Sequence, residues 1–87
     1  MYYLYILYSR KMDCYYIGST GNVADRLRKH LSRHGGFTGK AKDWEVVYTE
    51  NFSSKEEAVK REKQLKNWKN RSRIASLIKR GSVSKNA

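Results

Sequence analysis

The sequence predicts an α+β domain in which one small antiparallel sheet is flanked by helices. Runs of Tyr, Ile, Leu and Val typical of strands occupy three segments, and apolar residues at helical spacing occupy the segments between and after them. The chain has 87 residues, 39% of them hydrophobic, which suits one folded domain and exceeds the apolar content of disordered chains. We expect the domain to span residues 1–80, and residues 81–87 to form a disordered C-terminal tail.

Three segments are predicted strands. Tyr2 to Tyr8 is apolar at both alternating sets of positions, which indicates a strand covered on both faces. The short polar stretch from Ser9 to Asp13 predicts a hairpin connection, and Cys14 to Thr20 is the predicted return strand. Trp44 to Phe52 is apolar and β-branched enough to form the third strand.

The first predicted helix begins at Val23. Asn22 can cap its N-terminus, and Leu27 and Leu31 continue its apolar face at helical spacing. We expect a pair of glycines, Gly35 and Gly36, to end it.

A second predicted helix runs from about Lys55 to Trp68. Ser54 followed by Glu57 is a capping-box signature. Asparagines at positions 67 and 70 indicate a break, after which Ile74 and Leu77 predict a further amphipathic turn or two.

Positive charge is concentrated in the C-terminal part of the chain. The net charge is +11, and from Lys55 onward eleven basic residues stand against three acidic ones. Such a surface attracts polyanions, and the 13% aromatic content is a second ingredient of nucleic-acid sites. A well-solvated basic surface is the alternative. The candidate nucleic-acid-binding residues are Lys29, Lys66, Lys69, Arg71 and Arg73.

Other features bear on location and covalent structure. Cys14 is the single cysteine, so no intrachain disulfide can form. The apolar run from Tyr2 to Tyr8 is too short to span a bilayer, and no basic segment precedes it. We therefore expect a cytoplasmic protein that does not interact with membranes.

Glu62 is a carboxylate on an apolar helix face. Ala58 and Leu65 lie on either side of it on the helical wheel. Burial of an unpaired carboxylate is costly, so a partner must satisfy it. The sequence leaves two kinds of partner open: a nearby Lys or Arg, or a Mg²⁺ ion, which accepts one or two carboxylates and keeps several waters.

Arg26 and His30 share one face of the first helix because they are four residues apart. The arginine could hold a phosphate bidentately, and the histidine could move a proton or orient a water. Spacing alone favours a solvated basic face over these roles. Tyr5 and Tyr16 occupy two strands that should pair, where they either pack or offer hydroxyls to a phosphate or water.

Taken in order, these segments resemble the GIY-YIG nuclease superfamily. Tyr3-Leu4-Tyr5 and Tyr16-Ile17-Gly18 resemble the two elements that name it. The stretch from Asn22 to His30 resembles its first helix, Trp44 to Tyr48 its third strand, and Ala58 to Trp68 the helix with its metal-binding glutamate. The likeness covers residue 1 to about 80 and is closest to the small stand-alone bacterial members, which are similar to excinuclease C.

The resemblance implies a three-stranded antiparallel sheet flanked by helices, and hydrolysis of a nucleic-acid phosphodiester, DNA more readily than RNA. It implies a single Mg²⁺ or Mn²⁺ ion as cofactor. By position, Glu62 matches the metal ligand, Arg26 the phosphate-holding arginine, and Tyr5 and Tyr16 the catalytic tyrosines. His30 matches a position near the nucleophile that holds His or Tyr in relatives.

Two departures concern the motifs themselves. The Gly of GIY is Tyr3 here, and some relatives carry a Lys directly after YIG, where this chain has Ser19. The second departure leaves open which group transfers the proton. The alternative function from another class is a basic module that binds nucleic acid without cutting it.

Overall fold

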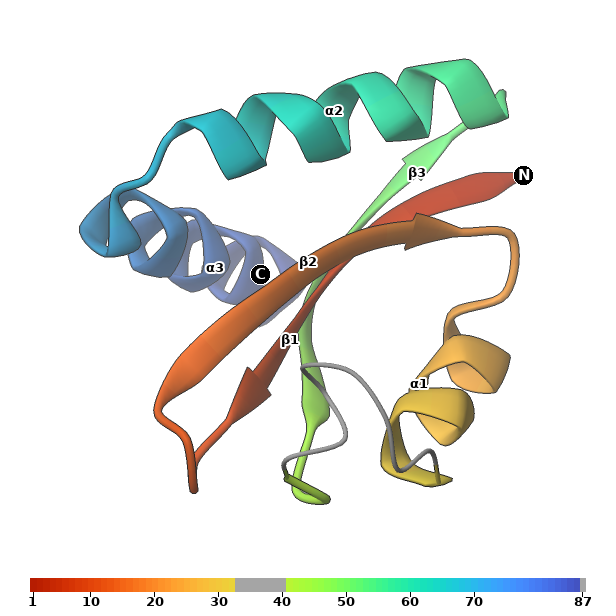
Figure 1. Cartoon of the computed structure of the whole chain (residues 1–87). Helices are drawn as coiled ribbons and strands as arrows, with labels where there is room; N and C mark the ends of the chain where they lie inside the picture. Colours follow the sequence, from red (N-terminus) through yellow and green to blue (C-terminus); the bar gives the residue numbers. More distant parts are fainter. Residues whose placement is uncertain (33–40, 87) are drawn as a thin grey trace.

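The computed structural model describes residues 1–32 and 41–86, and the side chains of residues 1–31 and 41–80. Within these residues the chain forms a sheet with helices packed on it (Figure 1). The elements in chain order are β1 (Tyr2–Ser9), β2 (Cys14–Thr20), α1 (Val23–Ser32), β3 (Glu45–Phe52), α2 (Lys55–Asn67) and α3 (Arg71–Asn86).

The sheet is antiparallel throughout, with the strand order β2-β1-β3. The hairpin between β1 and β2 sets the register, in which Tyr5 pairs with Gly18 and Leu4 with Ser19. In the pairing of β1 with β3, the register shifts between Ile6 and Leu7 of β1, which marks a bulge or irregularity. The predicted α+β fold with its three-stranded antiparallel sheet is confirmed, and β2 is an edge strand.

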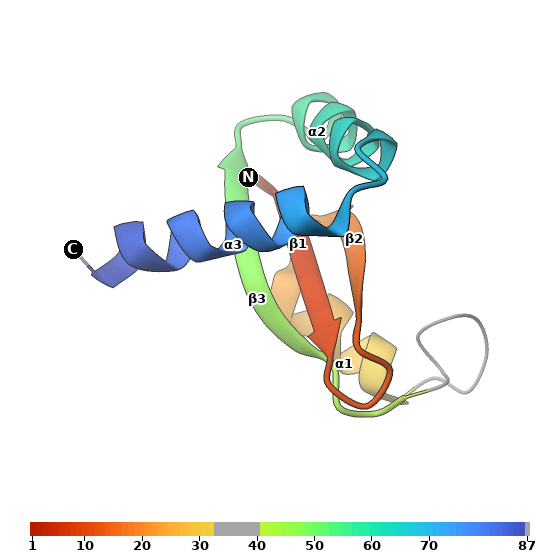
Figure 2. The same cartoon turned by 90° about the vertical axis from the view of Figure 1, so that its left-hand side faces the viewer.

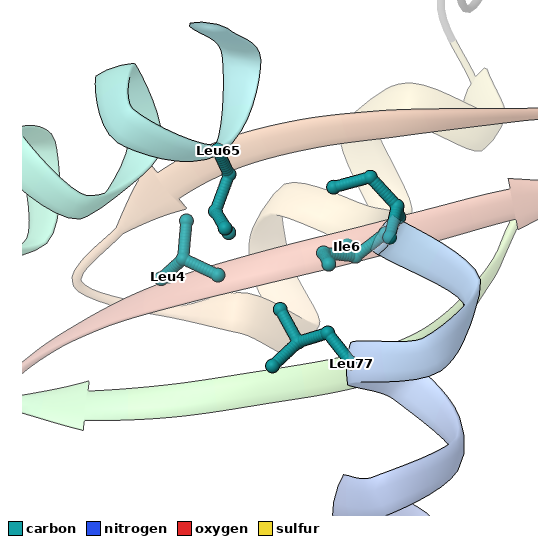
Figure 3. Packing of buried hydrophobic residues seen from close by; sticks show 5 residues of the cluster. Leu4, Ile6, Leu65 and Leu77 are labelled. Carbon is teal, nitrogen blue, oxygen red and sulfur yellow. The ribbon is translucent and has the colours of Figure 1, made fainter. Parts of the chain in front are cut away.

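The central strand β1 is covered on both faces, as its uniformly apolar sequence predicts. Leu4 and Ile6 pack with Leu65 of α2 and Leu77 of α3 on one face (Figure 3). On the other face Tyr5 belongs to a second cluster, against which the apolar side chains of α1 pack. The 90° view in Figure 2 shows α3 crossing one face of the sheet with α1 behind it.

The helices begin where the sequence predicts. Asn22 Oδ1 accepts a hydrogen bond from the backbone N–H of Asp25 at 2.9 Å and so caps α1. The Ser54 hydroxyl accepts one from the backbone N–H of Glu57 at the start of α2. Asn70 Oδ1 does the same for α3, at 3.2 Å from the backbone nitrogen of Arg73.

Several ends differ from the expectation. The third strand begins at Glu45 instead of Trp44 and ends at Phe52 as predicted, whereas α2 ends at Asn67 with Trp68 as its C-cap. The last helix is longer than the predicted turn or two and continues to Asn86, past the expected domain end at residue 80. The chain has no Pro that would stop it. The glycine pair expected to end α1, Gly35 and Gly36, lies outside the described residues.

In the part of the chain that the structure describes, no helix is long and apolar enough to cross a membrane.

Candidate functional site

Tyr5 extends over the edge strand because its partner in the sheet has no side chain. A Cβ atom added to Gly18 would lie 2.6 Å from the Tyr5 hydroxyl oxygen and 2.7 Å from the carbon that bears it. Real Cβ contacts are never that short, so only glycine leaves room for the phenol in this position. Tyr5 is 1% exposed, and its ring lies over its partner Gly18 on β2.

His30 of α1 meets two tyrosines of the sheet. Its Nε2 lies 3.0 Å from the Tyr5 hydroxyl oxygen. Its ring stands edge-on to that of Tyr16, with centroids 4.9 Å apart, and the two tyrosine rings are 6.4 Å apart. We call these three residues the Tyr5–Tyr16–His30 cluster. The register of the hairpin and the helical spacing of α1 thus place three predicted site residues in mutual contact.

Electrostatics fix the protonation states in this cluster. Burial, and next the neighbouring Tyr16, raise the pKa of Tyr5 to about 12, although the guanidinium of Arg26 partly offsets them. Burial and the positive charge of Arg26 both lower the pKa of His30. At neutral pH Tyr5 is therefore a phenol and His30 is neutral, and the tautomer of the ring decides whether the phenol or Nε2–H is the donor. Arg26 is exposed on α1, and its charge acts on both residues.

Glu62 of α2 reaches the same edge strand from the opposite face of the sheet. The Ser19 hydroxyl donates to Glu62 Oε1 at 2.7 Å. Ser19 follows Gly18 directly, and successive side chains of a strand point to opposite faces. The charge of Glu62 also contributes to the raised pKa of Tyr5. The carboxylate and the Tyr5–Tyr16–His30 cluster therefore approach β2 at adjacent residues.

Lys66 also belongs to this site. Its Nζ donates to Glu62 Oε2 at 2.7 Å and lies 6.0 Å from the centroid of the Tyr16 ring. The Glu62 side chain is 21% exposed and that of Lys66 is 50% exposed. The basic partner that the sequence left open as an alternative is thus present. Lys66, one of the candidate nucleic-acid-binding residues, thus pairs with the site's carboxylate.

The other candidate binding residues lie apart from Glu62. Lys29 of α1 pairs with Asp25 at 3.6 Å on the exposed face of that helix. Lys69 is exposed between α2 and α3 with a positive φ of 47°. Both are accessible to a polyanion.

The two arginines at the start of α3 have different surroundings. The guanidinium of Arg71 donates to the side-chain carboxylate and to the backbone carbonyl of Asp13, which lies in the β1–β2 turn. Arg71 therefore connects α3 to the hairpin. The guanidinium of Arg73 lies over the ring of Trp68, 4.3 Å from its centroid. These two arginines therefore do not share one surface role.

Sequence reasoning missed the contacts that Gly18, Ser19 and Lys66 make in the site. Gly18 belongs to a sequence motif, but no local pattern predicts that Tyr5 occupies the space beside it. Ser19 departs from the pattern of some relatives, yet its hydroxyl donates to Glu62. The i, i+4 spacing of Glu62 and Lys66 was a usable signal for their pairing.

Glu62 is the carboxylate of this site that could hold a divalent metal ion. Among the residues that the structure describes, no group of three or more His, Cys, Asp and Glu side chains could hold a metal. Mg²⁺ suits such a sparse site because it is commonly bound by one or two carboxylates and keeps several waters. Glu62 has both oxygens hydrogen-bonded, one of them to the half-exposed Lys66, which can leave for solvent.

The chain is similar to known proteins in sequence and in fold. The chain matches the family model of the GIY-YIG catalytic domain over residues 1–75. It is 32% identical over 80 residues to a UPF0213 protein of Staphylococcus haemolyticus, covering 91% of this chain and 96% of that protein. The solution NMR structure of a UPF0213 protein from Bacillus halodurans is also 32% identical, with a TM-score of 0.56, covering 91% of this chain and 84% of the other.

The family match spans the whole sheet, α1 and α2, and includes every residue of the site described above. It implies nuclease activity on nucleic acid, and enzymes of this kind generally depend on a divalent metal ion. From the fold and from these matches, we conclude that the chain belongs to the GIY-YIG family and is similar to UPF0213 proteins.

Proposed function

We propose that this protein is an endonuclease that uses Mg²⁺ or Mn²⁺ to hydrolyse a phosphodiester bond in nucleic acid, with DNA as the preferred substrate and RNA as the alternative. One observation carries the proposal: Glu62 of α2 and the Tyr5–Tyr16–His30 cluster meet β2 at two adjacent residues. A carboxylate, two phenols, an imidazole and a nearby guanidinium can together supply the acid–base and electrostatic catalysis of phosphodiester hydrolysis.

In this proposal His30 is the group that orients the attacking water and accepts its proton. Its lowered pKa keeps the imidazole neutral and thus able to accept. Tyr5 is a poor base at neutral pH, because its pKa is about 12. In the tautomer that this role needs, Nε2–H donates to the Tyr5 hydroxyl oxygen at 3.0 Å, which positions the ring. The basic lone pair is then on Nδ1, the nitrogen that would accept the proton of the water.

Arg26 is the phosphate-holding residue of the proposal. Its guanidinium is exposed on α1 and close enough to Tyr5 and His30 to affect the pKa of both. A planar guanidinium can bind two phosphoryl oxygens and stabilise the charge that builds on them during attack. The hydroxyl of Tyr16 is the second phenol available at the same edge.

Glu62 would hold the metal ion, and Ser19 would orient the carboxylate through its hydroxyl. The bound ion supplies Lewis-acid stabilisation of negative charge on the phosphate. Lys66 would leave Oε2 when the ion binds, since the two cations compete for one oxygen.

The experiment that tests the proposal is incubation of the full chain with a panel of single-stranded, duplex, flapped and branched DNA and RNA. Each substrate is tested with Mg²⁺, with Mn²⁺ and with EDTA. Metal-dependent cleavage of at least one substrate is expected, and its loss in Glu62→Gln assigns the cleavage to this protein. If every substrate stays intact with either metal, the nuclease proposal is wrong.

A basic module that binds nucleic acid without cutting it is the second candidate. The Glu62–Lys66 ion pair favours it, because the carboxylate is already satisfied without a metal. The two candidates differ in one measurement. A binding module retains salt-dependent affinity for nucleic acid and produces no metal-dependent product on any substrate of the panel.

A further inference from the structure

Two neighbouring residues of α2 turn toward opposite edges of the sheet. Glu62 is bonded to Ser19 on β2, whereas Arg61 makes a two-pronged ion pair with Glu50 on β3, at 2.9 and 3.0 Å. Because β1 lies between these strands, α2 separates the surface beside Arg61 from the catalytic edge. Any ligand site on the Arg61 side is therefore distinct from the site of cleavage.

A groove of about 380 Å³ lies on that side, between the C-terminal half of α2 and α3. Figure 1 shows the two helices meeting at the short link where one ends and the other begins. We call this surface the α2–α3 groove. It is lined mainly by Arg61, Trp68, Ser72, Arg73, Ser76 and Arg80.

The groove combines an aromatic ring with cations. Arg73 lies over the Trp68 ring at 4.3 Å and Arg61 at 5.8 Å from its centroid. Glu50 neutralises Arg61. No carboxylate among the described residues forms an ion pair with Arg73 or Arg80, so their charges are available to an anion.

The lining also contains neutral hydrogen-bonding groups. The hydroxyl-bearing residues Ser72 and Ser76 are exposed on the same face of α3 as Arg73 and Arg80. A ring for stacking, guanidinium groups for phosphate and hydroxyls for polar edges together match the chemistry of a nucleotide.

We propose that the α2–α3 groove binds an unpaired nucleotide of a single-stranded nucleic acid segment. The base stacks on the Trp68–Arg73 pair, and the flanking phosphate contacts Arg73 and Arg80. A duplex is a poor occupant, since its bases are stacked on one another and cannot enter a groove of this size. This inference rests on the proposed function and deepens it, because it predicts that the substrate carries a single-stranded segment beyond the cleaved bond.

The test measures binding without cleavage, on the full chain in EDTA. The affinity for a fluorescein-labelled single-stranded oligonucleotide is determined by anisotropy over a range of salt concentrations. The double variant Arg73→Gln/Arg80→Gln should lose about tenfold in affinity, and the magnitude of its log–log salt slope should fall by about 1.4, which is about 0.7 for each of two phosphate-contacting residues.

The matched control is Lys55→Gln/Lys60→Gln, which removes the same charge from exposed positions at the other end of α2. It should lose less than about threefold in affinity and leave the salt slope nearly unchanged. Equal losses in the two double variants would mean that only the net charge matters, and the proposed groove site would then be wrong.

Tryptophan fluorescence gives a second readout. The chain has two tryptophans, Trp44 and Trp68. Trp44 is 3% exposed in the core cluster that contains Tyr5, so a stacking base can reach only Trp68. An unlabelled single strand should quench the emission of the wild-type protein, and a duplex of the same sequence should quench it less. Trp68→Phe should abolish the quenching while a thermal melt shows that the variant is folded. Equal quenching in wild type and Trp68→Phe would overturn the proposal.

The inference and the proposed function can fail separately. Loss of binding and quenching in the groove variants together with no cleavage on any substrate would refute the nuclease and retain the groove. Metal-dependent cleavage together with groove variants that bind like the control would refute the groove and retain the nuclease.

Discussion

The phenol of Tyr5 occupies the space that a side chain at Gly18 would fill, since an added Cβ would lie 2.6 Å from the hydroxyl oxygen. This relationship crosses the β1–β2 pair, in which the two residues face each other. It explains why the strand after the hairpin needs a glycine at this position. The position of Tyr5 therefore depends on Gly18, a residue without a side chain. The position of His30 depends on it in turn, because His30 is hydrogen-bonded to Tyr5.

Gly18→Ala is therefore expected to displace Tyr5 and reduce cleavage. The overpacked methyl should cost about 1–3 kcal/mol of the free energy of unfolding. The control is Gly21→Ala, whose Cβ would meet Tyr2 only at 3.7 Å, an ordinary contact. Thermal melts and cleavage rates measure both effects. If Gly18→Ala cleaves and melts like Gly21→Ala, the close packing of Tyr5 on the strand has no functional consequence.

Glu62→Gln should reduce cleavage by at least about a hundredfold while leaving binding of nucleic acid in EDTA intact. The amide keeps the shape and can still accept the hydrogen bond from Ser19, but it lacks the charge that binds a metal. The free energy of unfolding should change by less than about 1 kcal/mol, because the lost ion pair with Lys66 is half exposed. A variant that cleaves at the wild-type rate would exclude Glu62 as the metal ligand.

Lys66→Gln tests the competition between the ammonium and the metal for Glu62. Removal of the cation bonded to Oε2 should lower the metal concentration for half-maximal cleavage by about twofold to tenfold, at saturating substrate. Lys63→Gln is the control, because Lys63 is exposed on the same helix and makes none of the ion pairs of the described residues. An unchanged or higher metal requirement in Lys66→Gln would contradict the competition.

The pH profile of cleavage should identify His30. Because burial and Arg26 lower its pKa, the rate should be level above the ordinary histidine value of about 6.5 and fall only at more acidic pH. His30→Gln should lose about a hundredfold in rate together with that acidic limb. A profile that keeps the same limb in His30→Gln would assign the proton transfer to another group.

The same shift predicts how acid affects stability. The folded state binds a proton on His30 less readily than the unfolded state does. The stabilising contribution of neutral His30 is therefore complete above about 6.5 and is lost as the pH falls through the lower folded-state pKa. Melting temperatures of wild type and His30→Gln should converge on acidification within this window. A difference that widens as the pH falls would mean that the fold favours the protonated ring.

Much of the fold could be read from periodicity and caps. Apolar residues at both alternating positions of β1 predicted a strand covered on both faces, and the two core clusters confirm it. Asn22 and Ser54 predicted helix starts that the structure has. The end of α3 was missed because the last residues carry no apolar periodicity, whereas backbone hydrogen bonding can continue without it.

By itself, the sequence determined which residues share a helix face or a strand face, because these follow from periods of 3.6 and 2 residues. It therefore placed Glu62 between Ala58 and Leu65 on the face of α2 that packs on the sheet, where those two neighbours are buried. Only the tertiary structure decided that Ser19, 43 residues away, meets this carboxylate and that the Tyr5 phenol lies over Gly18. Those contacts depend on the register of β1 against β2 and on how α2 lies across the sheet, and no local period encodes either.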